Sequence, residues 1–110
     1  MSIDEFVDFV KNKLISFYNP HALYLFGSQA RNKANENSDI DFLVINDSIK
    51  PKRQRALEFR KTMRGKNLYP IDIIVYTPKE FETECTIKGT VAYAVSREGK
   101  LLYGQHNQNS

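Results

Sequence analysis

The sequence predicts a single α/β (α+β) domain, in which short buried strands alternate with amphipathic helices. Apolar runs rich in branched and aromatic residues recur along the chain, and stretches with helical spacing separate them. At 110 residues the chain suffices for one core, and no linker rich in proline, glycine or serine divides it. Apolar residues make up 41% and charged residues 26%, which argues against both a disordered chain and a disulfide scaffold.

The first elements are a helix and a buried strand. Apolar residues at three- and four-residue steps, with acids early and lysines late, predict a helix over residues 3–18 that ends before Pro20. The apolar run at residues 22–26 is too short for a helix and stops at a glycine, which predicts a strand. Ser28 then has the position of an N-cap of a short helix, and residues 32–38 are polar and loop-like.

Strands and helices continue to alternate in the middle of the chain. Strands are expected from residue 39 to about 45 and over residues 71–76. The basic segment between them has helical spacing and is expected to stop near Gly65. Residues 77–80, Thr-Pro-Lys-Glu, form a capping box with proline at the first helical position, so another helix is expected to begin there.

The C-terminal part contains weaker signals. Roughly helical spacing predicts a helix over residues 87–95, followed by a turn at 97–99 and a short edge strand at 100–103. Residues 105–110 include no apolar side chain and are expected to be a frayed tail. The folded domain is therefore expected to span residues 1–104.

Charge and cysteine content narrow the class of protein. The lone Cys85 has no partner within the chain, which excludes an intrachain disulfide and a cysteine-rich zinc site and fits a reducing compartment. Charged residues interrupt the N-terminal apolar pattern, so it resembles neither a signal peptide nor a membrane span, and we expect a cytoplasmic protein without membrane binding. Residues 50–66 hold eight lysines or arginines against the single acid Glu58, which concentrates the basic charge.

Three aspartates, Asp39, Asp41 and Asp72, stand at the leading ends of predicted strands, where aspartate is depleted. Because strand side chains alternate, Asp39 and Asp41 project to one face, with α-carbons roughly 6.5 to 7 Å apart, and apolar residues project to the other. Neighbouring carboxylates require a shared proton or a multivalent cation, and hard oxygen ligands favour Mg²⁺ or Mn²⁺. The pattern predicts a two-metal phosphoryl-transfer site rather than a solvated strand entry.

A glycine-serine turn precedes the aspartates. Gly27 allows close backbone approach and positive φ, and Ser28 at a helix N-terminus offers unpaired N–H donors and a hydroxyl to a phosphate. Arg31, one turn later, has the reach to contact the same anion or to brace the turn. Taken alone, such a turn is more often only a helix cap, and its weight comes from the aspartates that follow it.

These motifs resemble a known family. Gly27-Ser28-Gln29-Ala30-Arg31, then Ser38-Asp39-Ile40-Asp41, and later Ile71-Asp72-Ile73-Ile74, are similar to the motifs of the minimal nucleotidyltransferase (MNT) family of the DNA polymerase beta superfamily. The resemblance spans most of the chain and includes the spacing between Ser28 and Asp39. It implies a polymerase-beta-like nucleotidyltransferase fold, a small mixed sheet with helices packed on it. It also implies transfer of a nucleoside monophosphate, with AMP from ATP expected, to an acceptor hydroxyl, and release of pyrophosphate.

The resemblance also implies roles for single residues. It implies that the catalytic residues, which also bind two Mg²⁺ ions (or Mn²⁺ as an alternative), are Asp39, Asp41 and Asp72. It implies that the nucleotide-binding residues are Gly27, Ser28, Arg31 and Ser38. Many proteins of this size are similar to the antitoxin halves of toxin-antitoxin pairs. The partner of such an antitoxin is a small helical HEPN protein, which is a candidate acceptor of the AMP.

Two other functions remain open from the sequence. One is a non-catalytic antitoxin that neutralises its partner by occlusion. The other is an RNA-directed nucleotidyltransferase, motivated by the basic segment at residues 50–66, although a solvated helix face explains that segment as well. Self-association is compatible with each of them. Side chains expected to have no part in the chemistry are the core aromatics Tyr24, Phe26 and Phe42, the isolated His21 and His106, and the structural Cys85.

Overall fold

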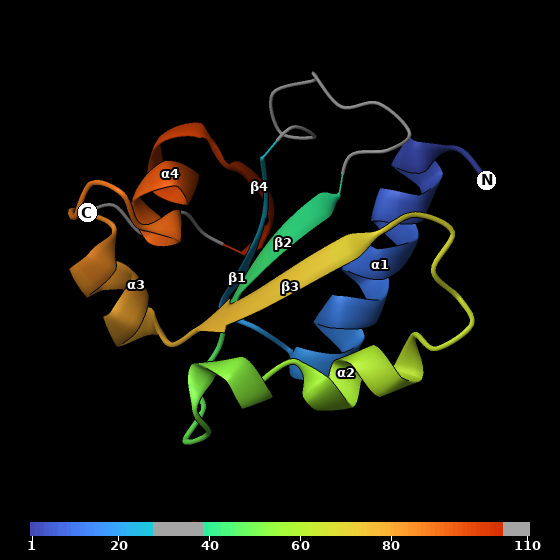
Figure 1. The fold of residues 1–110 in the computed structure, drawn as a ribbon, viewed down its shortest axis with the longest axis horizontal. Helices are drawn as coiled ribbons and strands as arrows, with labels where there is room; N and C mark the ends of the chain where they lie inside the picture. Colours follow the sequence, from blue (N-terminus) through green and yellow to red (C-terminus); the bar gives the residue numbers. More distant parts are fainter. Residues whose placement is uncertain (28–38, 105–110) are drawn as a thin grey trace.

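Four strands form one mixed sheet. The computed structural model describes residues 1–27 and 39–104 (Figure 1). The strands are β1 (Ala22–Phe26), β2 (Ile40–Ile45), β3 (Ile71–Tyr76) and β4 (Lys100–Gly104). Their order in the sheet is β3-β2-β1-β4, with β1 antiparallel to both β2 and β4, and β2 parallel to β3. The mixed sheet that the resemblance implied is confirmed, and β4 forms an edge as expected.

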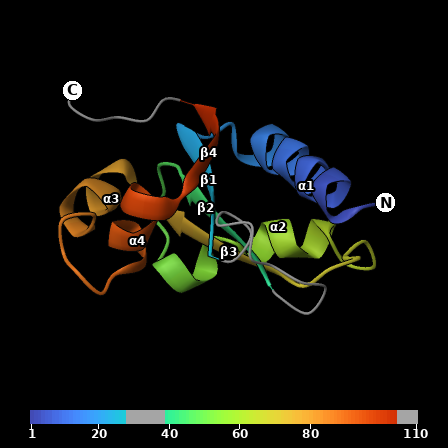
Figure 2. The same cartoon turned by 90° about the horizontal axis from the view of Figure 1, so that it is seen from above.

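Helices cover both faces of the sheet. They are α1 (Ile3–Tyr18), α2 (Leu57–Thr62), α3 (Pro78–Glu84) and α4 (Val91–Glu98), with a 3₁₀ turn at Lys52–Gln54. Figure 2 shows α1 and α2 on one side of the sheet and α3 and α4 on the other. No helix in the described part of the chain is long and apolar enough to cross a membrane.

Each face of the sheet has its own buried cluster. Beneath α1 and α2 the larger cluster contains, among others, Phe6, Val10, Leu14, Leu23, Phe42, Phe59 and Val75. Beneath α3 and α4 the smaller cluster contains Ala22, Tyr24, Leu43, Ile45, Tyr76, Ala92 and Val95. The expected burial of Tyr24 and Phe42 is confirmed, and Phe26 is half-buried against the smaller cluster. Because the side chains of a strand alternate between its two faces, the sheet contributes apolar residues to both buried clusters.

Local signals set most element boundaries. The Ser2 hydroxyl accepts from the Glu5 N–H, and the Glu5 carboxylate accepts from the Ser2 N–H. At the other end α1 stops at Tyr18, and Asn19, whose φ is +48°, is its C-cap. The predicted bounds of α1, β1 and β3 are confirmed, and β2 begins at Ile40. The predicted capping box at α3 is also present, with Thr77 and Glu80 exchanging both bonds.

Three boundaries differ from the prediction. The C-terminal helix α4 begins at Val91, because Thr90 caps it by accepting from the Tyr93 N–H, and the preceding Gly89 has a φ of +93° that no α-helix accommodates. The helix continues through Glu98, so the turn expected at residues 97–99 is wrong. The basic segment breaks into the 3₁₀ turn and α2, which ends at Thr62, ahead of Gly65.

Candidate active site

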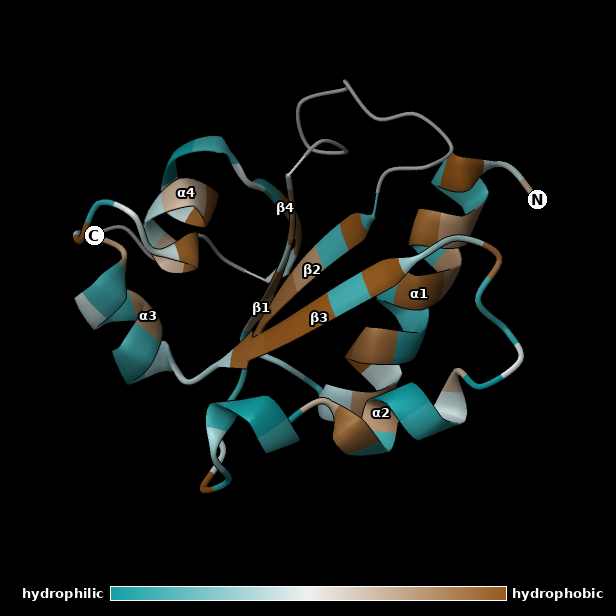
Figure 3. Cartoon of the chain, in the orientation of Figure 1, coloured by the Kyte–Doolittle hydropathy of each residue, from teal (hydrophilic) through white to brown (hydrophobic). Residues whose placement is uncertain are grey.

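The structure brings two of the three aspartates side by side. Asp41 and Asp72 are each the second residue of their strand, and they are directly paired in the parallel register of β2 with β3. Figure 3 shows one hydrophilic band on each of these otherwise hydrophobic strands. Neighbouring strands lie about 4.8 Å apart, so paired residues project together to the same face. That face is the one beneath α3 and α4, whereas Ile40 and Phe42 point into the larger cluster.

The third aspartate lies just outside the strand. Asp39 directly precedes β2 and is exposed. Burial of the Asp41 carboxyl, together with the negative charges of Asp72 and Asp39, raises the pKa of Asp41 to about 6. Both neighbours therefore act on Asp41 through their charge. The three carboxyl groups form an acidic site whose negative charge is only partly compensated.

Gly27 closes one side of this acidic site. It follows β1 directly, and the last residue of β1, Phe26, pairs with Asp41 across the sheet. The φ of Gly27 is +77°, and a β-carbon built there would lie 2.5 Å from Oδ2 of Asp41. Position 27 thus excludes a side chain for two reasons, the backbone conformation and the contact with the carboxylate.

The other predicted nucleotide-binding residues fall in a segment that the structure does not describe. Ser28, Arg31 and Ser38 lie outside the described residues, as does the short helix expected after Gly27. The tail at residues 105–110, which contains His106, also lies outside them. The roles of these residues stay predictions.

An arginine that sequence reasoning had not singled out contacts Asp72. The Nη2 atom of Arg60, on α2, donates to Oδ1 of Asp72 at 3.1 Å and to the carbonyl of Ile73 at 3.5 Å. The same Oδ1 accepts from the Ile73 N–H at 3.1 Å. No spacing rule links a helix residue to a strand residue twelve positions away, so the sequence held no signal for this pair.

The donor set of the site fits a hard divalent cation. Carboxylate oxygens are the ligands that Mg²⁺ and Mn²⁺ prefer. The pKa of Asp41 is raised first by burial and then by the charges of Asp72 and Asp39, and a cation would offset those charges. Within residues 1–27 and 39–104, however, no three histidine, cysteine or carboxylate groups converge closely enough to hold a metal ion. One oxygen of Asp72 is turned instead to Arg60.

Four of the eight lysines and arginines in the basic segment form ion pairs with other residues that the structure describes. These pairs are Lys52–Glu84, Arg55–Glu80, Arg60–Asp72 and Lys61–Glu58. The Arg55 side chain is only 7% exposed and also donates to the carbonyls of Lys50 and Val75. The segment therefore serves in large part to attach the 3₁₀ turn and α2 to β3 and α3. This use of its charges weakens the argument for an RNA-binding surface.

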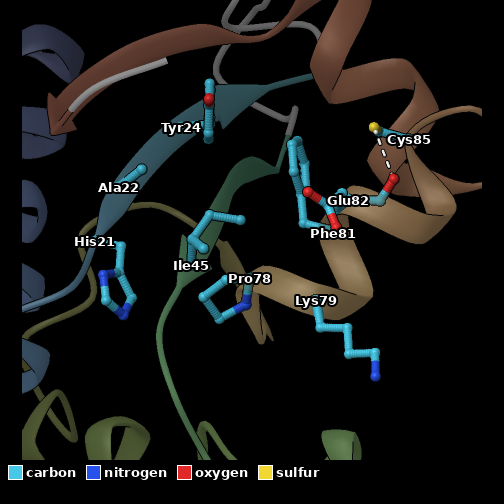
Figure 4. Close-up of a pocket in the computed structure, with 9 residues that line it drawn as sticks. All are labelled: His21, Ala22, Tyr24, Ile45, Pro78, Lys79, Phe81, Glu82 and Cys85. Carbon is cyan, nitrogen blue, oxygen red and sulfur yellow. Dashed lines mark hydrogen bonds between the residues drawn. The ribbon is translucent and has the colours of Figure 1, made fainter. Parts of the chain in front are cut away.

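A separate cavity of about 570 Å³ lies at the other end of the same sheet face (Figure 4). It is lined by His21, Ala22, Tyr24, Ile45, Pro78, Lys79, Phe81, Glu82 and Cys85. Ala22 pairs with Ile45 at this end of the strands, whereas Asp41 pairs with Phe26 at the opposite end. The cavity is therefore distinct from the acidic site.

The contacts around this cavity revise one expectation and fit another. His21 was expected to be isolated, but its Nε2 lies 3.0 Å from Oδ2 of Asp47, so that expectation is wrong. Both side chains of this pair are exposed. The thiol of Cys85 donates to the carbonyl of Glu82 at 3.3 Å, which fits the structural role expected for it.

Comparison with known proteins places this geometry in context. A family model described as polymerase beta, nucleotidyltransferase matches residues 9–108. A solved structure described as the crystal structure of the toxin-antitoxin with AMP-PNP is similar in fold, with a TM-score of 0.58 and 24% sequence identity. The match covers 86% of this chain and 73% of that one. No curated protein matches the sequence.

Proposed function

This chain belongs to the polymerase beta nucleotidyltransferase family, and on that premise we propose that it is an enzyme that transfers a nucleoside monophosphate to an acceptor hydroxyl. The expected donor is ATP, and the expected products are an adenylylated acceptor and pyrophosphate. The observation that carries the proposal is the pairing of Asp41 with Asp72 on one face of the sheet, with the side-chain-free Gly27 against Asp41. This arrangement concentrates oxygen ligands beside a glycine turn of the kind that binds phosphate through backbone N–H groups.

The proposal gives a role to each residue of the acidic site and to Gly27. Asp39, Asp41 and Asp72 would turn their carboxylates toward one another to hold Mg²⁺, which when bound would supply Lewis-acid stabilisation of the charge on the phosphate oxygens. Gly27, which has no β-carbon, lets the Asp41 carboxylate lie against the backbone, and its positive φ suits a turn whose N–H groups would bind the triphosphate.

The reaction needs one bond to form while another breaks. The acceptor oxygen attacks the α-phosphorus in line and forms the new P–O bond. The bond from the α-phosphorus to the bridging oxygen breaks, and its electron pair leaves with pyrophosphate. The hydroxyl proton has Asp72 as its candidate acceptor.

The acceptor we propose is a toxin partner of the HEPN type, which makes the chain an antitoxin that modifies its toxin. The fold similarity to a structure described as a toxin-antitoxin with AMP-PNP supports both a toxin partner and an adenine nucleotide. The family resemblance of the Gly27-Ser28 and Asp39-Ile40-Asp41 motifs supports the HEPN identity.

The experiment that tests this function is a label-transfer assay. The purified chain, its partner protein and ATP labelled at the α-phosphate are incubated with Mg²⁺, and label on the partner is measured. We expect transfer that EDTA abolishes and that Asp39→Ala and Asp41→Ala each reduce to background. Transfer that survives both substitutions, or a partner that stays unlabelled, would contradict the proposal.

A second candidate function is neutralisation of a partner by binding alone. The contact of Arg60 with Asp72 favours it, because Asp72 then has a structural partner that requires no metal ion. Toxin inhibition by a variant with Asp39, Asp41 and Asp72 all changed to alanine separates the two functions. Full inhibition by this variant favours occlusion, and loss of inhibition favours catalysis.

A further inference from the structure

We propose that Arg60 is a positioning residue that serves as the resident counter-ion of Asp72, and that a divalent cation must displace its guanidinium to use Asp72 as a ligand. The inference rests on the proposed function, in which Asp72 is a metal ligand. It adds a residue from α2 to the acidic site formed by β2 and β3.

The contacts show that Arg60 competes for the atom that a cation would need. Oδ1 of Asp72 accepts from Nη2 of Arg60 at 3.1 Å and from the Ile73 N–H at 3.1 Å. Because Nη2 also donates to the Ile73 carbonyl at 3.5 Å, the guanidinium contacts the β3 backbone next to the Asp72 carboxylate. A cation that approaches Oδ1 therefore meets a group of the same charge.

The chemistry of arginine makes this competition unavoidable. A guanidinium remains protonated throughout the physiological pH range, so Arg60 cannot yield by losing a proton. It has to move away from Asp72 instead. Like charges a few ångströms apart repel one another, so the guanidinium at its present place weakens the binding of a divalent cation.

The pair is also placed so that it can open. The Arg60 side chain is 43% exposed and that of Asp72 50%, and exposed ion pairs contribute little to stability. The neighbouring Arg55–Glu80 pair is different, because two nitrogens of Arg55 donate to the two carboxylate oxygens of Glu80 and the Arg55 side chain is 7% exposed. Opening the Arg60 pair leaves the attachment of α2 intact, because Phe59, fully buried, still packs into the larger core.

Mn²⁺ binding to the metal-free full chain, measured by titration calorimetry, tests the proposal. Arg60→Met keeps the apolar stem and removes the charge, and we expect it to bind Mn²⁺ roughly fivefold more tightly than the wild type. Arg64→Met is the matched control, since it makes the same change in net charge at an exposed position, and we expect a much smaller effect. Arg60→Lys keeps the positive charge and is expected to stay close to the wild type.

A double variant ties the effect to Asp72. In an Asp72→Asn background, Arg60→Met is expected to give no gain in Mn²⁺ affinity, because the competition has been removed. Equal affinities for Arg60→Met and Arg64→Met, weaker binding by Arg60→Met, or no Mn²⁺ binding by any variant would overturn the proposal. Thermal unfolding in EDTA verifies that each variant is folded.

The label-transfer assay distinguishes failure of this inference from failure of the proposed function. Without AMP transfer, an Asp72-dependent gain in Mn²⁺ affinity still supports displacement of Arg60 while the proposed activity falls. With AMP transfer but equal affinities in the two methionine variants, the activity stands and the role of Arg60 falls.

Discussion

Gly27 lies so close to Asp41 that a β-carbon at position 27 would come within 2.5 Å of the Asp41 Oδ2 atom. The contact joins the end of β1 to the second residue of β2, across the antiparallel pairing of Phe26 with Asp41. It makes the glycine a steric requirement of the acidic site, in addition to its backbone conformation. A comparison of two glycines can separate these two requirements.

Gly27→Ala is expected to reduce AMP transfer by about 100-fold, because the new methyl group displaces the Asp41 carboxylate. Gly65→Ala is the control, since Gly65 has a φ of +79° and nothing within 4 Å of an added β-carbon. Both variants should lose about 1 to 2 kcal/mol of unfolding free energy from the left-handed backbone. Label transfer and urea denaturation measure the two effects, and equal transfer by both variants would contradict the steric role.

Asp41→Asn is expected to stabilise the metal-free protein at neutral pH while it abolishes transfer. Burial and the charges of Asp72 and Asp39 raise the pKa of Asp41 from 3.8 to about 6. Between these values the folded protein holds a proton that the unfolded chain releases, so the unfolding free energy of the wild type falls as pH rises through this window. Asparagine does not titrate, so the unfolding free energy of the variant does not fall in this way.

The size of this effect is modest because Asp41 is partly solvated. After allowance for solvent screening we expect Asp41→Asn to be about 1 kcal/mol more stable than the wild type above pH 6. The advantage should vanish below about pH 4. Urea denaturation in EDTA at pH 7 and pH 4 measures it, and a difference that does not change with pH would refute this account.

Glu80→Gln is expected to destabilise the protein by about 1 to 2 kcal/mol at pH 7, because it removes the partner of the nearly buried Arg55. Glutamine can still complete the capping box of α3, so the loss reports the ion pair. The bonds from Arg55 lower the pKa of Glu80 from 4.5 to about 2. The stabilisation is therefore present above pH 4.5 and is lost as pH falls toward 2.

The exposed Lys61–Glu58 pair supplies the comparison for Glu80. Glu58→Gln breaks an ion pair at 3.7 Å between two exposed side chains, and we expect a loss below about 0.5 kcal/mol. Denaturation of both glutamine variants at pH 7 and pH 3 measures the two pairs. If Glu58→Gln destabilises the protein as much as Glu80→Gln, burial of Arg55 does not strengthen its ion pair.

Much of the fold followed from local patterns. The bounds of α1, β1 and β3 were predictable because apolar spacing and stop signals such as Pro20 lie within a few residues of each boundary. The start of α4 was missed, since apolar spacing continues backward to Ile87, which is 49% exposed and lies before the Thr90 cap. Spacing alone does not tell a buried apolar residue from an exposed one.

The site was predictable only in part, for a related reason. Period-two alternation and the family resemblance together indicated that Asp41 and Asp72 share a face, and the register of β2 with β3 brings them together. The contact of Arg60 with Asp72 depends instead on how α2 packs against β3, a long-range property that no local pattern encodes. Sequence motifs therefore identified the acidic groups but missed the basic group that faces one of them.

The parallel pairing of β2 with β3 also has a consequence for how the acidic site assembles during folding. A slip of β3 by a single residue would carry Asp72 to the side occupied by α1 and would turn Ile73 out of the larger core, toward the face beneath α3 and α4. Burial of apolar side chains thus favours the one register of β2 with β3 in which Asp41 and Asp72 are paired. A molecule that has completed its core has, by the same event, assembled its acidic pair.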